Sequence, residues 1–215
     1  GEVLPQNIGT MKWDGKIPFK HTEKLSIKRS DDFDEDCLAP QWQWNYQPRK
    51  DYFSLTERPG WLRLKAYRPL ETNNLLKAGN TLTQRTFRKQ NNDVTIKMDI
   101  SNMQDGQKNG LCHFSSQHSA IGIVKEEDAC YLEYRKNGNI TKGIQIHSEF
   151  IWFRTEWGMD GKSQYYYSLD GDNFLPFGEK YQLTWGNYRG DRIGIYCFND
   201  KKETGSVDVD YCHYR

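Results

Sequence analysis

The chain has 215 residues, which suits one large β domain or a domain with a short extension. Thirty basic and 29 acidic side chains leave a formal net charge of +1, so no strong overall field draws the chain to nucleic acid or to an anionic membrane. Aromatic residues make up 14% of the sequence, unlike in a disordered chain, and no apolar run of about 18 residues encodes a transmembrane helix.

The first 29 residues mix proline, glycine and lysine without a sustained period. They are predicted to form a linker or lead-in segment, and Trp13 and Phe19 would need a surface to cover them. No secretory signal peptide is recognisable, and Gly1 is typical of an expression-tag scar. The predicted folded domain is therefore residues 30–215.

From Asp31 onward the hydrophobic period is that of β-strands. In the segment 94–100, the alternate residues Val94, Ile96 and Met98 are apolar and the intervening residues are polar, which predicts a strand buried on one face. Further short β-branched or aromatic runs occupy residues 61–66, 81–87, 129–135, 149–156, 162–170, 191–198 and 206–214.

Turn signals separate these runs. They are Arg58-Pro59-Gly60, Asp105-Gly106, Asn137-Gly138, Asp160-Gly161, Asp170-Gly171 and Arg189-Gly190. Asn-Gly and Asp-Gly suit tight hairpins, which need positive φ angles. The segment 70–82 comes nearest to a helical pattern, but its asparagine pair and Gly79 predict a loop or a single helical turn. Short strands at intervals of about 8 to 12 residues predict an all-β fold, a sandwich of two antiparallel sheets.

The sequence offers no independent catalytic site. Glycoside hydrolysis needs two carboxylates about 5 to 9.5 Å apart across a pocket. The carboxylates of this chain are expected at turns or on exposed strand faces, as for Asp99 and Glu133. No nucleophile elbow, dinucleotide fingerprint or P-loop is present. The five cysteines form no metal-binding spacing, and buried free thiols or one unassigned disulfide are expected.

Acidic residues gather near both ends of the predicted domain. Asp31 and Asp32 open its first strand, and Asp208 and Asp210 lie in the last. First and last strands of a sandwich are often neighbours, so these carboxylates could meet and bind Ca²⁺ through hard oxygen ligands. Alternatively, they are solvated edge charges that discourage strand-to-strand aggregation.

Aromatic and hydrogen-bonding side chains alternate in several strands. Gln41 to Asn45 alternates amides with the indoles of Trp42 and Trp44, and a similar mixture recurs at Trp152, Arg154, Trp185, Asn187 and Arg189. Amide and guanidinium groups can bind sugar hydroxyls, and aromatic faces can stack on pyranose rings. The alternative is that rings such as Trp42, Trp44 and Trp61 belong to the core.

A set of motifs gives a more specific indication. They are, in chain order, residues 30–33 (SDDF), 38–45 (LAPQWQWN), 54–64, 80–85, 165–171, 190–196 and 209–211. Together they resemble the C-terminal concanavalin A-like module of family 43 glycoside hydrolases, the β-xylosidases and α-L-arabinofuranosidases. The resemblance covers residues 30–215 and implies a concanavalin A-like jelly roll.

The resemblance also implies partners and a cellular location. In two-domain relatives this module follows a five-bladed propeller that carries the catalytic carboxylates, and nothing in this chain resembles that propeller. The chain alone is therefore expected not to be an enzyme, although its parent protein would act on xylan or arabinoxylan, plant cell-wall polysaccharides, in a secreted or periplasmic location.

Two site assignments come from the same resemblance. Relatives commonly hold Ca²⁺ in the sandwich, which assigns Asp32 and Asp210 as its ligands. In some β-xylosidases a loop of the module, here residues 190–194, places an aromatic side chain near the substrate. This chain has Arg192 at that position, so stacking would be replaced by hydrogen bonding.

Three functions stay open at the level of sequence. The first is an accessory module that packs on the catalytic propeller and helps to shape its substrate site. The second is a free-standing carbohydrate-binding module for xylan, with the candidate residues Trp152, Arg154, Trp185, Asn187, Arg189 and Arg192. The third is a purely structural sandwich.

Overall fold

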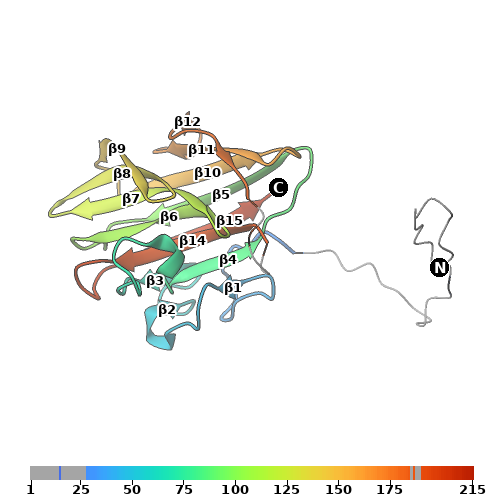
Figure 1. The fold of residues 1–215 in the computed structure, drawn as a ribbon. Coiled ribbons are helices and arrows are strands. Elements are labelled where there is room, and N and C mark those ends of the chain that lie inside the picture. The colour runs from blue at the N-terminus through green and yellow to red at the C-terminus, as the bar shows by residue number, and fades with distance from the viewer. Residues whose placement is uncertain (1–14, 16–27, 185, 187–189) are drawn as a thin grey trace.

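The computed structural model describes residue 15 and residues 28–184, 186 and 190–215. Two antiparallel sheets stack face to face (Figure 1), which confirms the predicted two-sheet, all-β sandwich. Apart from Gly15, Lys28 and Arg29, the predicted lead-in segment lies outside the described residues. In the described part of the chain, no helix is long and apolar enough to span a membrane.

The seven-stranded sheet has the order β1-β4-β14-β6-β7-β8-β9. Its strands are β1 (Gln43–Trp44), β4 (Thr81–Arg85), β6 (Gln107–Phe114), β7 (His118–Glu126), β8 (Ala129–Lys136), β9 (Asn139–Ile146) and β14 (Arg192–Asn199). Neighbours in sequence pair as hairpins from β6 to β9, whereas β14 returns from near the C-terminus to lie between β4 and β6.

The eight-stranded sheet has the order β12-β11-β10-β5-β15-β3-β2, and β13 also pairs with β11. Its strands are β2 (Phe53–Ser54), β3 (Leu62–Lys65), β5 (Asn92–Asp99), β10 (Phe150–Trp157), β11 (Lys162–Ser168), β12 (Leu175–Pro176), β13 (Tyr181–Gln182) and β15 (Ser206–Tyr214). Two short 3-10 helices, η1 (Lys50–Tyr52) and η2 (Leu75–Lys77), lie in the connections.

The core lies between the sheets because alternate residues of each strand point inward. Ile195 of the seven-stranded sheet and Ile96 and Phe153 of the eight-stranded sheet are completely buried there. Full burial of such a side chain contributes about 1.5–3 kcal/mol. Trp42 belongs to this core, which confirms for this ring the alternative that the tryptophans are core residues. Trp61 lies outside the core and is only partly buried.

Two predicted local features are confirmed. Asn137 and Gly138, with φ angles of 48° and 88°, make the two-residue turn of the β8–β9 hairpin, in which Lys136 pairs with Asn139. The segment 70–82 contains the short helix η2 and, at its end, the first two residues of β4. Leu75 and its neighbours pack on the outer face of the seven-stranded sheet in a second apolar cluster with Tyr196 and Phe198.

The first and last described segments lie side by side, as the sequence predicts. The backbone N–H of Asp31 donates to the carbonyl of Cys212 at 2.9 Å, and the N–H of Cys212 donates back to Asp31 at 2.8 Å. This bridge joins the start of the domain to the central strand β15. All five cysteines are free: Cys112, Cys197 and Cys212 are buried, Cys130 is half-buried and Cys37 is exposed.

Candidate functional site

Trp152 and Arg154, two of the residues predicted to bind carbohydrate, lie together on the outer face of the eight-stranded sheet. Both alternate along β10 with core residues such as Phe153, so their side chains point away from the other sheet. Trp152 Nε1 donates to the hydroxyl of Tyr211 at 3.1 Å. Arg154 Nε donates to Thr95 Oγ1 at 3.0 Å.

Cations lie against aromatic rings along this face. We call Trp61, Lys97, Phe150, Trp152 and Arg154 the outer strip. Lys97 Nζ lies 5.1 Å from the ring centroid of Trp61, 5.4 Å from that of Phe150 and 5.7 Å from that of Trp152. These distances are typical of cation–π contacts. The rings of the outer strip are therefore only partly free for a ligand.

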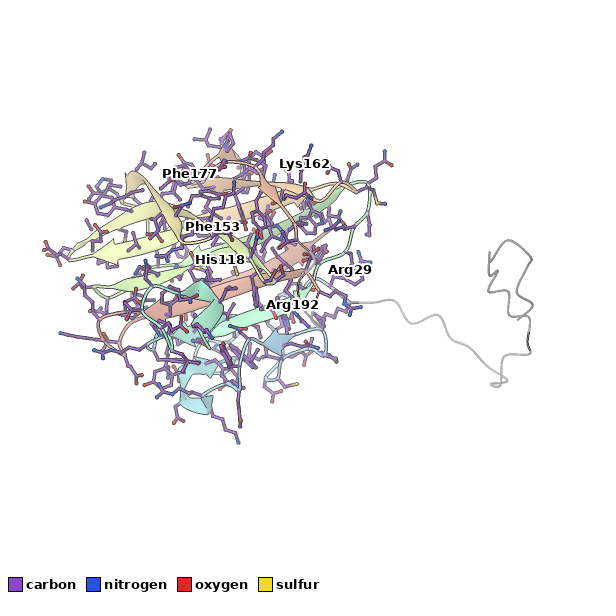
Figure 2. The ribbon with its side chains drawn as sticks, viewed as in Figure 1. Arg29, His118, Phe153, Lys162, Phe177 and Arg192 are labelled. Atoms are coloured by element: carbon purple, nitrogen blue, oxygen red, sulfur yellow. The ribbon has the colours of Figure 1, made fainter. Side chains whose placement is uncertain are left out.

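Arg192, the third described candidate, lies on the opposite side of the molecule. Ile193 and Ile195 of β14 point into the core, so Arg192 faces outward from the seven-stranded sheet. It is 9% exposed and lies at the same end of the sandwich as Arg29 (Figure 2). The structure thus brings Trp152 and Arg154 together but not Arg192. Trp185, Asn187 and Arg189 lie outside the described residues.

The carboxylates predicted to bind calcium each have a partner from the protein. Asp32 Oδ1 lies 2.7 Å from His213 Nε2, and Asp210 Oδ2 lies 2.7 Å from Lys97 Nζ. Asp31 accepts a hydrogen bond from Trp42 Nε1 at 2.7 Å. Among the described residues, no group of three His, Cys, Asp or Glu side chains that could hold a metal ion is present. Both carboxylates that the resemblance assigns to Ca²⁺ already have a partner from the protein.

Asp99 and Glu133, expected on exposed strand faces, are in fact 8% and 5% exposed, so that prediction is wrong. Loops cover the outer faces on which they lie. Arg58, in the loop before β3, reaches Asp99 Oδ2 at 2.6 Å and Asp208 Oδ2 at 2.9 Å. Burial alone would raise the pKa of Asp99, but hydrogen bonds from Ser101 and Arg58 hold it below its ordinary value. Glu133 is paired with Arg135.

A groove of about 860 Å³ opens on the outer face of the seven-stranded sheet. Residues of four adjacent strands line it: Lys108 of β6, Glu126 of β7, Tyr131 and Glu133 of β8, and Lys142 of β9. None of these residues was predicted as a binding residue. The polar alternation in β8 is the sequence signal for the groove, and it also suits an ordinary solvated face.

Two ion pairs lie beneath the groove. Glu133 and Arg135 have side chains that are 6% and 3% exposed, and Arg135 Nη1 also donates to Asn73 Oδ1 at 2.7 Å. Lys108 pairs with Asp200, and their side chains are 13% and 11% exposed. Buried charge on the outer face of a sheet is costly unless it is paired.

Residues 30–215 match the family described as the β-xylosidase C-terminal concanavalin A-like domain. The chain is 35% identical over 219 residues to a β-xylosidase of Formosa agariphila, and the match covers 93% of this chain and 37% of that protein. The chain therefore spans little more than a third of the length of this curated relative.

Solved structures give the same fold. A bifunctional GH43-CE protein of Bacteroides eggerthii superposes with a TM-score of 0.79 at 28% identity, over 86% of this chain and 25% of that one. A family 43 glycoside hydrolase engineered to display both endo-xylanase and exo-arabinofuranosidase activity superposes with a TM-score of 0.80 at 24% identity, over 91% of this chain and 42% of that one. At the latter identity the likeness shows the fold alone.

Proposed function

The chain belongs to the family of β-xylosidase C-terminal concanavalin A-like domains, which are non-catalytic modules of family 43 glycoside hydrolases, and we propose that it serves as the accessory domain of such an enzyme. The observation that carries the proposal is the family match across residues 30–215 together with its β-xylosidase relative. The parent enzyme would act on xylan or arabinoxylan, and its catalytic five-bladed propeller would be the main partner of this domain.

The end of the sandwich at which Lys28 and Arg29 enter is the surface we assign to the propeller. The guanidinium carbon of Arg29 lies 4.2 Å from the ring centroid of Phe87, and Gln84 Nε2 donates to the carbonyl of Arg29 at 3.1 Å. These contacts hold Arg29 at this end of the sandwich and support the assignment of the propeller to it.

The accessory role is tested by assaying the chain alone and with the catalytic domain of its parent enzyme. We expect no release of 4-nitrophenol from 4-nitrophenyl xyloside or arabinofuranoside by the chain alone, and a higher Tm for the two domains in one polypeptide than for either domain alone. Turnover that persists through purification, or identical melting of joined and separate domains, would refute the proposal.

Arg192 would contribute to the substrate site of the assembled enzyme by hydrogen bonding. Its position at the start of β14, on the same end as Arg29, supports this role. In the two-domain enzyme, Arg192→Ala should raise KM for xylo-oligosaccharides while the Tm is maintained. An unchanged KM would remove Arg192 from the substrate site.

Carbohydrate binding by the domain alone is a second candidate function, because Trp152 and Arg154 share one partly exposed face. Affinity electrophoresis on soluble xylan tests it. Retardation that Trp152→Ala abolishes would support binding at the outer strip, and unchanged mobility on several polysaccharides would leave the purely structural role as the better account.

A secreted or periplasmic location is also proposed, because xylan and arabinoxylan are polymers that stay outside the cell. Cell fractionation of the producing organism tests this location. Recovery of the parent enzyme in the cytoplasmic fraction alone would contradict it.

A further inference from the structure

We propose that the groove over the seven-stranded sheet is a binding site for an uncharged pyranose oligosaccharide. The groove lies on the other sheet from the outer strip and shares no residue with it. The proposal does not depend on docking to a propeller. It rests on the charge, burial and shape of the groove.

Buried charge forms the floor of the groove. Glu133 lines the groove, yet its side chain is 94% buried and its partner is Arg135, whose Nη2 atom lacks a hydrogen-bond partner among the described residues. Apolar side chains at these two positions would avoid the desolvation cost of the pair. Arg135 Nη1 also donates to Asn73 Oδ1, so the pair holds the Glu133 carboxylate in place in the groove lining, where a carboxylate can accept a hydrogen bond from a sugar hydroxyl.

Three cationic side chains in and beneath the groove are paired with carboxylates. Lys108 pairs with Asp200, Lys142 with Glu126 and Arg135 with Glu133, so the groove presents cations that are already neutralised. An anionic ligand would have to displace these carboxylates. A sugar hydroxyl both donates and accepts hydrogen bonds, and it can therefore bridge the two members of a pair without disrupting it.

Tyr131 and Ile140 give the groove an apolar wall. Tyr131 is half-buried on β8, and Lys142 Nζ lies 3.5 Å from its ring centroid. The Lys142 side chain is 45% exposed, so it can move aside and leave the ring to the C–H face of a pyranose. The exposed Ile140 extends the apolar edge along β9. The volume of about 860 Å³ lies within the 300–1,000 Å³ typical of ligand sites and suits a short oligosaccharide.

The test is isothermal titration of the full chain with xylohexaose, cellohexaose, glucuronic acid and inorganic phosphate. We expect binding of at least one neutral hexasaccharide and none of the two anions. Tyr131→Ala should weaken that binding by about tenfold or more, as truncation of a central aromatic contact commonly does. Tyr46→Ala, which removes an exposed tyrosine outside the groove, serves as the matched control and should leave the affinity unchanged.

A second variant protects the test against misfolding. Lys142→Ala removes an exposed side chain and uncovers the Tyr131 ring, so it should preserve the Tm and retain or improve neutral-sugar binding. The proposal is overturned if neither hexasaccharide binds, if only the anions bind, or if Trp152→Ala abolishes binding while Tyr131→Ala does not. Sugar binding without association with the propeller would keep this site and refute the accessory role.

Discussion

His113 is held as a neutral imidazole between the two sheets. Its Nε2 atom lies 2.8 Å from Thr155 Oγ1, and its ring packs edge to face with Trp157. Burial lowers the pKa of His113 from 6.5 to about 3. Between these two values the unfolded chain takes up a proton that the folded chain does not. The contribution of neutral His113 to the free energy of unfolding is therefore fully present above pH 6.5, and it falls as the pH drops below that value.

We expect His113→Asn to flatten the dependence of stability on pH. His113 alone contributes at most about 1.4 kcal/mol per pH unit below its unfolded pKa. Urea unfolding of the wild-type chain and the variant at pH 7, 6 and 5 gives the two slopes. Equal slopes would show that His113 is not the group that titrates. Burial, together with the charge of Arg135, also lowers the pKa of His118 to about 4, so a residual slope is expected.

Asp208 depends on Arg63 for its charge balance. Arg63 Nε and Asp208 Oδ1 are 2.7 Å apart, and the Asp208 side chain is only 2% exposed. Breaking a buried pair by removing one partner costs about 3–5 kcal/mol. Because Arg58 also reaches Asp208 and would remain, we expect Arg63→Ala to lower the free energy of unfolding by about 3 kcal/mol, near the low end of that range.

The matched control for Arg63→Ala is Arg49→Ala. Arg49 pairs with Glu203 at 2.8 Å, but both side chains are well exposed, at 49% and 38%. An exposed pair of this kind contributes about 0–1 kcal/mol. Equal losses in chemical denaturation of the two variants would contradict the special role of the buried carboxylate.

The burial of a side chain was harder to infer from the sequence than the face of the sheet to which it points. Alternation correctly placed Val94, Ile96 and Met98 on one face of β5. It assigned Asp99 to the other face, which is correct, but it gave no sign that the loop carrying Arg58 covers that face. Coverage by a distant loop is a tertiary contact, and the alternation of apolar and polar residues within one strand carries no information about it.

At the scale of elements, the strands that build the groove carried the weakest sequence signals. β6 and β7 are buried on both faces over most of their length, so they lack the alternation of apolar and polar residues that marks a half-buried strand. β9 has the opposite burial, since most of its residues are exposed. Period-two patterns identify neither kind of strand, and the groove therefore came from the structure.

The β8–β9 hairpin depends on the conformational freedom of Gly138. Its φ angle is +88°, and a Cβ placed there would meet nothing within 4 Å. Any cost of Gly138→Ala is therefore backbone strain, about 1–2 kcal/mol for a left-handed conformation. Chemical denaturation measures it. Gly158→Ala is the control, because Gly158 has no left-handed φ and an added Cβ would make contacts no closer than 3.4 Å. Equal losses in both variants would contradict the role of this turn.

At the scale of the whole molecule, the sequence was most informative about architecture and least informative about surfaces. The two-sheet sandwich, the Asn137-Gly138 turn and the nearness of the first and last segments were predicted and are confirmed. The candidate residues did not form one surface. Trp152 and Arg192 fall on opposite sheets because sequence order does not indicate which sheet a strand joins.

Calcium provides a test of how the ends of the domain are stabilised. An ion bound at a free concentration 100 times its Kd would stabilise the folded chain by about 2.7 kcal/mol, and a chelator would remove that stabilisation. His213 lies against Asp32 and Lys97 against Asp210, so each of these two carboxylates already has a partner from the protein. We therefore expect the same Tm in millimolar CaCl₂ and in excess EDTA. A Tm that rises with CaCl₂, returns with EDTA and loses this response in Asp32→Asn and Asp210→Asn would instead establish the ion at these residues.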